Sequence, residues 1–193
     1  MSQDKKIIEL TPHLNRRQLL KAGLLASMVC LAPLPAWARY GLTDYQERSL
    51  SLLNTHTGER IKQIVYWEQG SYIPDALHDI NYVLRDHRTD EVHSIDPKTL
   101  DLMVALSKRV EAKNPFEIIS GYRSPQTNSA LRSSSQGVAK NSYHMQGKAV
   151  DLRLRGVPLK VVRNAARTLQ MGGVGYYPKS DFVHIDTGRV RAW

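Results

Sequence analysis

The stretch Ser142-Tyr143-His144-Met145-Gln146-Gly147-Lys148-Ala149-Val150-Asp151 decides how this chain is organised, because it sets an imidazole and a carboxylate in one short segment with a glycine between them. From Ala149 to Leu154 apolar and polar residues alternate, which predicts a strand. Val150, Leu152 and Leu154 would face a core, and Asp151 would lie on the opposite face. Since one histidine and one aspartate are too few for a metal site, a third ligand must come from downstream. Phe182-Val183-His184-Ile185-Asp186 supplies a candidate.

His144, Asp151 and His184 together make a predicted zinc site. Hydrolytic zinc is usually held by three protein ligands, with a fourth position left for water. Nitrogen and oxygen donors suit zinc, so no cysteine is required. Zinc lowers the pKa of its bound water from about 15.7 to about 7, which supplies a hydroxide at neutral pH. The pattern therefore predicts a Zn²⁺ hydrolase.

Hydrolysis also needs groups that move protons and hold the substrate, and three residues are candidates. Asp181, three residues before His184, is a candidate general base that would take the proton of the metal-bound water. Asp186 shares a strand face with His184 and could instead orient its imidazole. Arg123 follows a predicted strand and suits a substrate carboxylate or a developing oxyanion. A structural turn with an exposed guanidinium is the alternative interpretation of Arg123.

Other polar and aromatic residues allow competing interpretations. Four potential metal ligands occur in a polar segment without an organising strand, where a solvated loop is the favoured interpretation. Two tyrosines after a glycine pair either line a cleft or simply pack. These residues are His87, Asp90, Glu91 and His93 in the first group and Tyr176 and Tyr177 in the second.

The first 38 residues have the pattern of an export signal. Asn15 to Lys21 contains a twin arginine, Ala22 to Leu34 is a short apolar run, and Ala36-Trp37-Ala38 is a small-x-small cleavage site. The apolar run is shorter than the roughly 20 residues of a membrane span. We therefore predict a twin-arginine signal at 1–38, a single domain at 39–193 and a periplasmic location, with no membrane span after cleavage.

Charge and cysteine content narrow the possible partners. The formal net charge is +9, and it falls to +6 without residues 1–38, which carry five Lys or Arg and two Asp or Glu. In an exported protein such charge favours anionic envelope polymers or a membrane surface over nucleic acid. The only cysteine, Cys30, lies in the predicted signal. Stability must then come from a core without disulfides, which a domain of about 150 residues can supply.

The order of predicted elements indicates an α+β domain. Two strands joined by Asn54 to Gly58 form a hairpin, and two amphipathic helices follow it, the second capped by Asp96 with Pro97 at its first position. No internal repeat or domain linker is visible. The predicted strands are 49–53, 60–67, 116–120, 149–154, 174–177 and 181–186, and the predicted helices are 75–85, one beginning at 97, a short one within 124–137, and 158–169.

Three motifs in order resemble the M15 zinc peptidases that act on bacterial cell-wall peptides. They are Ser142-x-His144-x-x-Gly147-x-Ala149-x-Asp151, the later Asp181-x-x-His184, and the earlier Ser120-Gly121-Tyr122-Arg123-Ser124. The signal and the hairpin Asn54-Thr55-His56-Thr57-Gly58-Glu59 narrow the resemblance to exported murein endopeptidases.

The resemblance implies a fold and a set of roles. The fold would be a small domain with a central antiparallel sheet and flanking helices, like that of hedgehog and D-Ala-D-Ala peptidases. His144, Asp151 and His184 would bind Zn²⁺, Asp181 would be the general base, and Arg123 would contact substrate. Some relatives have Glu at the base position, so the shorter Asp181 departs from their pattern.

The activity that the resemblance implies is hydrolysis of peptide cross-links in peptidoglycan, including bonds between two diaminopimelate residues. A carboxypeptidase that removes terminal D-alanine is one alternative, and it would need a closed pocket where an endopeptidase needs an open groove. A non-catalytic wall-binding protein with a structural metal is another. Digestion of cross-linked muropeptides separates these alternatives. The residues do not indicate an oligomeric state.

Overall fold

The computed structural model describes residues 47–135 and 137–193. The predicted signal at 1–38 lies outside these residues. Within the part described, no helix combines the length and apolar character needed to cross a membrane.

The described chain begins with a hairpin, as predicted. Strands β1 (Glu47–Asn54) and β2 (Arg60–Glu68) pair antiparallel, and the short β3 (Ser71–Tyr72) extends the hairpin on its outer side. The Asn54 side chain makes the turn, because its amide oxygen accepts hydrogen bonds from the backbone N–H groups of His56 and Thr57 at 2.9 and 3.2 Å. Asparagine is favoured at such turns for this reason.

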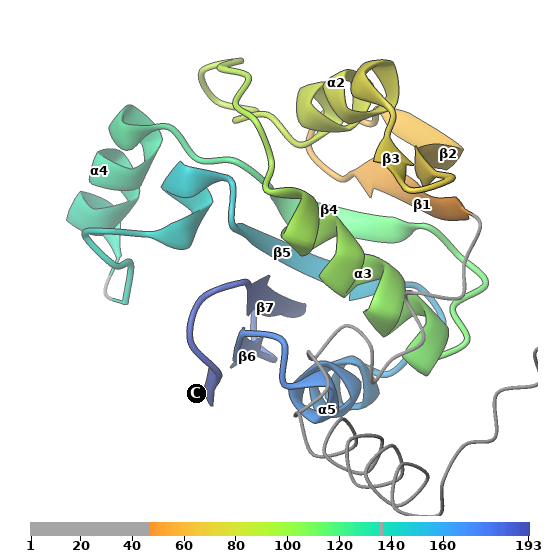
Figure 1. The fold of residues 1–193 in the computed structure, drawn as a ribbon. Helices are drawn as coiled ribbons and strands as arrows, with labels where there is room; N and C mark the ends of the chain where they lie inside the picture. Colours follow the sequence, from red (N-terminus) through yellow and green to blue (C-terminus); the bar gives the residue numbers. More distant parts are fainter. Residues whose placement is uncertain (1–46, 136) are drawn as a thin grey trace, which may run out of the picture. The chain divides into compact units, whose positions relative to one another are not determined.

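All strands of the described residues join one mixed sheet of eight strands, in the order β3-β2-β1-β4-β5-β7-β6-β8. Figure 1 labels each of them except β8. Most neighbours are antiparallel, but β1 with β4 and β6 with β8 are parallel. The predicted α+β class is therefore correct. The expected antiparallel sheet is confirmed for the remaining strand pairs, whereas β4 is parallel to β1 because a long helical crossover returns the chain beside β1 in the same direction. The remaining bounds are β4 (Phe116–Ser120), β5 (Ala149–Leu154), β6 (Gly173–Tyr177), β7 (Phe182–Asp186) and β8 (Arg191–Ala192).

Three helices cover one face of the sheet, which leaves the opposite face of β5 and β7 for the polar residues. Helix α2 (Pro74–Val83) packs on β1 and β2, while α3 (Pro97–Arg109) and α5 (Leu159–Leu169) pack on each other and on the sheet (Figure 1). Asp96 caps α3 by accepting a hydrogen bond from the Lys98 N–H at 3.0 Å. The core between these layers includes Ile80, Leu100, Leu152, Leu169 and Ile185.

Two further elements lie at one end of the sheet. Helix α4 (Pro125–Ser134) and the short 3₁₀ helix η3 (Tyr143–Gln146) lie close together before β5 (Figure 1). The helix begins at Ser124, whose hydroxyl accepts from the Thr127 N–H at 3.1 Å. The short elements η3, β3 and β8 are absent from the sequence prediction, since two to four residues carry too little periodicity to be recognised.

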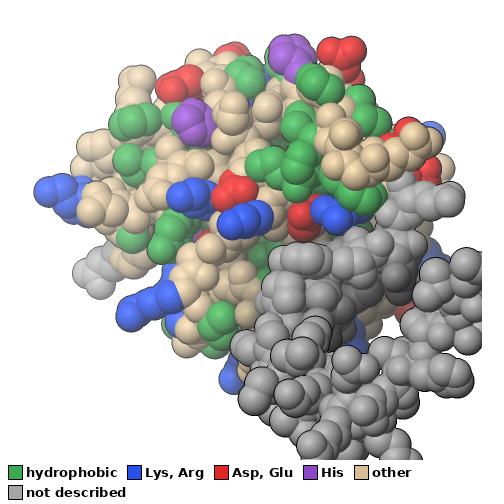
Figure 2. Space-filling view, in the orientation of Figure 1, with side chains coloured by type: hydrophobic (Ala, Val, Ile, Leu, Met, Phe, Trp, Pro, Cys, Tyr) green, Lys and Arg blue, Asp and Glu red, His purple; other side chains and the backbone are tan. Residues whose placement is uncertain are grey.

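Charge is spread rather than gathered on the molecular face drawn in Figure 2. Over the described part of that face, lysine and arginine side chains lie among aspartate and glutamate side chains.

Candidate metal centre and active cleft

The pairing of two central strands brings the first two predicted ligands together. β5 and β7 are antiparallel, and Asp151 lies directly opposite His184 in their register. Directly opposed residues have their side chains on the same face of the sheet. Because Leu152 and Ile185 are in the core, this shared face is the one that the helices leave open.

His144 reaches the same place from the η3 turn. The Ser142 hydroxyl accepts a hydrogen bond from the His144 N–H at 3.3 Å and so begins the turn. Gly147 ends it in the left-handed region with φ of 65°. A side chain at Gly147 would also collide with the backbone carbonyl of Ser94. Glycine is therefore required between the imidazole and the strand that carries Asp151.

The three ligand atoms converge. His144 Nε2 lies 3.2 Å from His184 Nδ1, which lies 2.8 Å from Asp151 Oδ1, and His144 Nε2 lies 3.3 Å from the same oxygen. Tetrahedral zinc with bonds of about 2.1 Å separates its ligand atoms by roughly 3.4 Å. Within 47–135 and 137–193, only this group of three or more potential ligands brings its donor atoms within 4.8 Å of one another.

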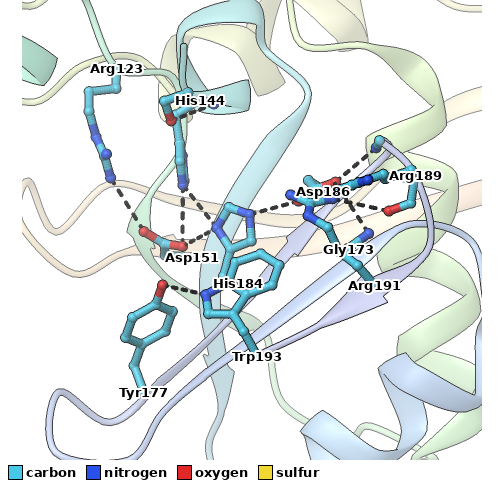
Figure 3. Close-up of polar contacts among 12 residues, drawn as sticks. Arg123, His144, Asp151, Gly173, Tyr177, His184, Asp186, Arg189, Arg191 and Trp193 are labelled. Atoms are coloured by element: carbon cyan, nitrogen blue, oxygen red, sulfur yellow. Dashed lines mark hydrogen bonds and ion pairs between the residues drawn. The ribbon is translucent and has the colours of Figure 1, made fainter. Parts of the chain in front are cut away.

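Hydrogen bonds on the outer side of each ring decide which nitrogen carries a proton. His144 Nδ1 lies 2.7 Å from the Gly121 carbonyl oxygen, and His184 Nε2 lies 3.0 Å from Asp186 Oδ2. Both partners only accept, so these two nitrogens donate. In the neutral form of each ring, the inner nitrogen then carries a lone pair that faces the Asp151 carboxylate (Figure 3). Three acceptors pointing at one another fit a cation, which would relieve their mutual repulsion.

Asp186, the outer partner of His184, is fully buried. Its carboxylate accepts from the N–H groups of Gly173 and Gly188 at 3.2 and 2.8 Å. Arg191 adds two parallel hydrogen bonds at 3.0 and 2.7 Å. Burial alone would raise the pKa of Asp186, but these bonds and the bond to His184 hold the pKa below its usual range. The carboxylate is thus charged and fixed, as a support for a metal-bound histidine must be.

The pKa values of His184 and Asp151 also indicate that positive charge is favoured at this point. Burial lowers the pKa of His184, but its hydrogen bonds to Asp151 and Asp186 outweigh burial and raise the pKa to about 9. Burial raises the pKa of Asp151, but His144 and His184 bring it far below the usual carboxyl range. Buried anions that draw protons onto a neighbouring imidazole are stabilised by any cation at that point. A divalent metal ion would supply that charge.

The cluster forms part of the wall of an open cleft of about 530 Å³. The lining of the cleft includes Arg123, Tyr143, Tyr177 and Trp193. Figure 3 shows Arg123 and Tyr177 on opposite sides of the Asp151 carboxylate. The segment after α4 closes one side, from Ser135 to Asn141 with residue 136 left aside. A metal ion at the cluster would therefore have a coordination position open toward a ligand in the cleft.

Comparison with known proteins identifies the family of this chain. A family model described as "Peptidoglycan L,D-endopeptidase MepK", of the M15 type, matches residues 43–193. The chain belongs to that family. An Escherichia coli K12 protein of the same description is 45% identical over 179 residues, which are 93% of this chain and 97% of the relative. A Haemophilus influenzae protein described as probable peptidoglycan L,D-endopeptidase MepK is 41% identical over 93% of this chain and 95% of its own length.

Arg123, the predicted substrate contact, lies at the cleft as a member of the M15 motif that follows β4. Its guanidinium Nη2 is 3.5 Å from Asp151 Oδ2, and its side chain is 12% exposed. Burial lowers the pKa of Arg123, while the charge of Asp151 partly offsets that effect. Its buried Nε has no hydrogen-bond partner within the described residues. A buried cationic donor facing a cleft suits an anionic ligand.

Asp181, the predicted general base, lies beside the centre rather than in it. Its carboxylate accepts from Arg153 Nη1 at 2.8 Å, its side chain is 63% exposed, and it borders a neighbouring hollow with Glu117. Arg153 follows Asp151 by two residues on the same strand face, which is a step of about 7 Å. The general-base role of Asp181 therefore stays a prediction, and it requires the carboxylate to leave Arg153.

The four potential metal ligands of the polar loop each contact a residue outside their own group. The His87 ring stacks on that of His56 at 3.8 Å, and the His93 ring stacks on that of Tyr122 at 4.6 Å. Asp90 pairs with Arg85, and Glu91 accepts from the Tyr122 hydroxyl at 2.7 Å. No shared centre forms among them, which agrees with the interpretation as a polar loop.

Three contributors to the site escaped the sequence interpretation. Asp86, which is not among the predicted site residues, is buried and accepts from the Ser124 N–H at 2.8 Å, which positions the turn after Arg123. Burial raises the pKa of Asp86, but hydrogen bonds from Thr127 and neighbouring backbone lower it to about 2. Arg191 and Trp193 reach the cleft from the last strand. Their only sequence signal is an aromatic and a basic residue at the C-terminus.

Proposed function

We propose that this protein is an exported zinc endopeptidase that hydrolyses peptide cross-links in peptidoglycan. The observation that carries the proposal is that acceptor atoms of His144, Asp151 and His184 converge at an open cleft. The outer nitrogen of each histidine is held by a hydrogen bond, to the Gly121 carbonyl or to Asp186. Membership of the M15-type family and two relatives described as peptidoglycan L,D-endopeptidases support the same activity.

Zinc is the metal we propose, with His144 Nε2, His184 Nδ1 and Asp151 Oδ1 as its ligands. Two neutral imidazoles and one carboxylate form a donor set suited to zinc. When bound, the metal supplies a water of lowered pKa and polarises the carbonyl of the bond to be cut. The protein holds both imidazoles in the required tautomer through the Gly121 carbonyl and Asp186.

Arg123 is the proposed substrate contact. Its guanidinium is nearly buried at the cleft, where the Asp151 carboxylate lies 3.5 Å from it and the negative charge of Asp86 also acts on it. A further anion would complete its pairing, and cell-wall stem peptides carry free carboxylates. We therefore assign Arg123 to a substrate carboxylate or to the oxyanion that forms during hydrolysis.

Asp181 is the proposed general base, which accepts a proton from the attacking water and passes it to the leaving amine. This role needs the carboxylate to exchange its contact with Arg153 for one with the water. Asp181→Asn tests it directly. The variant should fold, bind zinc as the parent does, and lose hydrolysis. If it hydrolyses substrate at the parent rate, the base is another group.

The bond proposed as substrate joins two diaminopimelate residues. Such a bond runs from an L-centre to a D-centre, which is the sense of the "L,D" in the descriptions of the relatives. Peptidoglycan lies outside the cytoplasm, so the enzyme must be exported. A periplasmic location reached through the twin-arginine signal at 1–38 is part of this proposal, although that segment lies outside the described residues.

The experiment is digestion of purified muropeptides by the mature chain. Dimers joined between two diaminopimelate residues, dimers joined from D-alanine to diaminopimelate, and monomers ending in D-alanine are incubated with the zinc-loaded protein, with and without a chelator. The proposal expects monomers from the first dimer alone, and no reaction once zinc is removed.

The other outcomes identify the alternatives. Release of D-alanine from monomers without loss of dimers would make the protein a carboxypeptidase. A folded, zinc-loaded protein that binds peptidoglycan without cutting any of the three substrates would make it a wall-binding module. Cleavage that persists in the chelator would remove the metal from the mechanism.

A further inference from the structure

The last residue of the chain holds a tyrosine at the mouth of the cleft. Tyr177 ends β6, and the indole Nε1–H of Trp193 donates a hydrogen bond to its hydroxyl oxygen at 2.8 Å. Backbone hydrogen bonds fix Trp193 beside β6, since its N–H donates to Val174 and its carbonyl accepts from Tyr176. Both side chains line the cleft that contains His184.

The direction of this hydrogen bond determines what the tyrosine can do. An indole N–H can only donate, so the Tyr177 oxygen must accept, and its own proton is left for another partner. Within residues 47–135 and 137–193, no hydrogen bond uses the Tyr177 hydroxyl as donor. Figure 3 shows this hydroxyl directed toward the side of the cleft where Asp151 lies. A ligand at the metal centre would thus meet a prepared O–H donor.

Packing holds both rings in place. The Tyr177 ring stacks on Phe182 with centroids 4.6 Å apart, and the Trp193 ring lies against His184 at 5.4 Å. Gly175 makes room for them, because a Cβ there would come within 2.8 Å of the Tyr177 ring and 2.9 Å of the Trp193 ring. Donors that are fixed before reaction do not need to reorganise when charge develops.

We propose that Tyr177 is a catalytic residue that donates a hydrogen bond to the carbonyl oxygen of the scissile bond as that oxygen becomes negative. Trp193 is its positioning residue. Addition of water to the carbonyl carbon moves the C=O electron pair onto oxygen, and the Tyr177 O–H stabilises that charge without giving up its proton. Collapse of the intermediate restores the carbonyl and expels the amine, which takes its proton from the general base. This inference rests on the proposed peptidase function.

Tyr177→Phe removes the donor and keeps the ring. Loss of one such donor lowers kcat by about 100-fold in comparable sites, and we expect a fall of this order with KM changed less than about threefold, because the bond strengthens only in the transition state. Zinc content and thermal stability should match the parent. The matched control is Tyr176→Phe, whose ring instead lies under Arg163 at 4.6 Å and should leave kcat unchanged.

Trp193→Phe tests the positioning role. It keeps an aromatic ring but loses the N–H, so we expect a smaller fall in kcat, of about three- to tenfold. The double variant with Tyr177→Phe should be no slower than Tyr177→Phe alone, since Trp193 acts through the hydroxyl. Two independent structural effects would multiply instead.

A binding measurement gives a readout separate from turnover. A phosphinate analogue of the tetrahedral intermediate and the product peptide are titrated calorimetrically into the parent and Tyr177→Phe. Tyr177→Phe should weaken the analogue by about the factor lost in kcat and the product by less than about threefold. Parent-like kcat in Tyr177→Phe, or equal weakening of both ligands, would overturn the inference. A parent protein that cuts no muropeptide would instead refute the proposed function itself.

Discussion

Two clefts of nearly equal volume differ in how their polar groups are paired. The first, of about 540 Å³, is lined by Arg48, Trp67, Tyr72 and Asp101 among others, and the second, of about 530 Å³, contains the metal centre. In the first, both Asp101 oxygens accept from Arg48 at 2.9 Å, and the Tyr66 hydroxyl donates to one of them at 2.8 Å. Volume therefore does not distinguish the two clefts.

The pairing of charges does distinguish them. In the first cleft both oxygens of the Asp101 carboxylate meet donors, and the Arg48 guanidinium also lies over the Trp67 ring at 4.1 Å. In the second, three acceptor atoms face one another and each ligand uses its outer side for support. Polar groups that are hydrogen-bonded to one another stabilise a fold, whereas acceptors that face one another are stabilised by a bound cation. This contrast marks the second cleft as the functional one.

Removal of one acceptor from the metal centre should have the largest effect. We expect His144→Ala to weaken zinc binding by more than the 10–100-fold that is typical of losing an outer partner, and to abolish hydrolysis. Zinc at 100 times its Kd should stabilise the parent by about 2.7 kcal/mol and the variant by far less. Metal analysis and thermal unfolding with and without zinc measure both effects. A variant that kept one zinc ion per chain and its activity would show that these acceptors are not the centre.

Removal of the outer support should have the next largest effect. Asp186→Asn removes the charge behind His184 and can present an N–H in place of an acceptor, so we expect zinc affinity to fall by about 10–100-fold. Competition with a chelating dye measures the affinity. Asp181→Asn is the matched control, because it makes the same change outside the cluster and should bind zinc as the parent does. Equal affinity in both variants would contradict the role assigned to Asp186.

The first cleft should respond in stability alone. Asp101→Asn leaves Arg48 and the Tyr66 hydroxyl with a weaker partner, and we expect the free energy of unfolding to fall by about 1–3 kcal/mol. Burial and the charge of Asp101 raise the pKa of Tyr66 beyond its usual range, which agrees with a tight contact. Urea unfolding measures the loss, and kcat should be unchanged. A loss of activity without a loss of stability would give this cleft a function.

The smallest effect should come from His87, which lies outside both clefts and stacks on His56. Burial, together with the charges of His56 and Arg88, lowers the pKa of His87 to about 4. The unfolded chain binds this proton more readily, so His87 costs stability as pH falls from about 6.5 toward 4. Since the ring is partly exposed, we expect less than about 1 kcal/mol.

Urea unfolding at pH 7 and pH 5 tests this, with His87→Phe as the variant that lacks the titrating group. The parent should lose more stability than His87→Phe over that interval. Identical pH dependence of the two proteins would show that the His87 pKa is not lowered.

The regular elements and the candidate residues His144, Asp151 and His184 were predictable because both have local signals. Alternation in Ala149–Leu154 and the Asp96-Pro97 start of α3 identify their elements without any knowledge of the partners. The parallel pairing of β1 with β4 has no such signal, because it depends on the path of the intervening helices. The placement of Asp181 was equally inaccessible, since a residue in a turn has no periodicity that assigns its side chain to a face.

The sequence by itself determined an α+β domain and three potential zinc ligands. The periodicity of a strand and the residue type of a ligand can both be recognised within a short segment of the chain. Only the tertiary structure decided that Arg191 and Trp193 support the centre and that Tyr177 lines the cleft with a hydroxyl proton that no described residue accepts. Those roles depend on which atom of one side chain meets which atom of another across the sheet. The direction of a hydrogen bond follows from which two atoms are in contact, and no pattern along the chain predicts that contact.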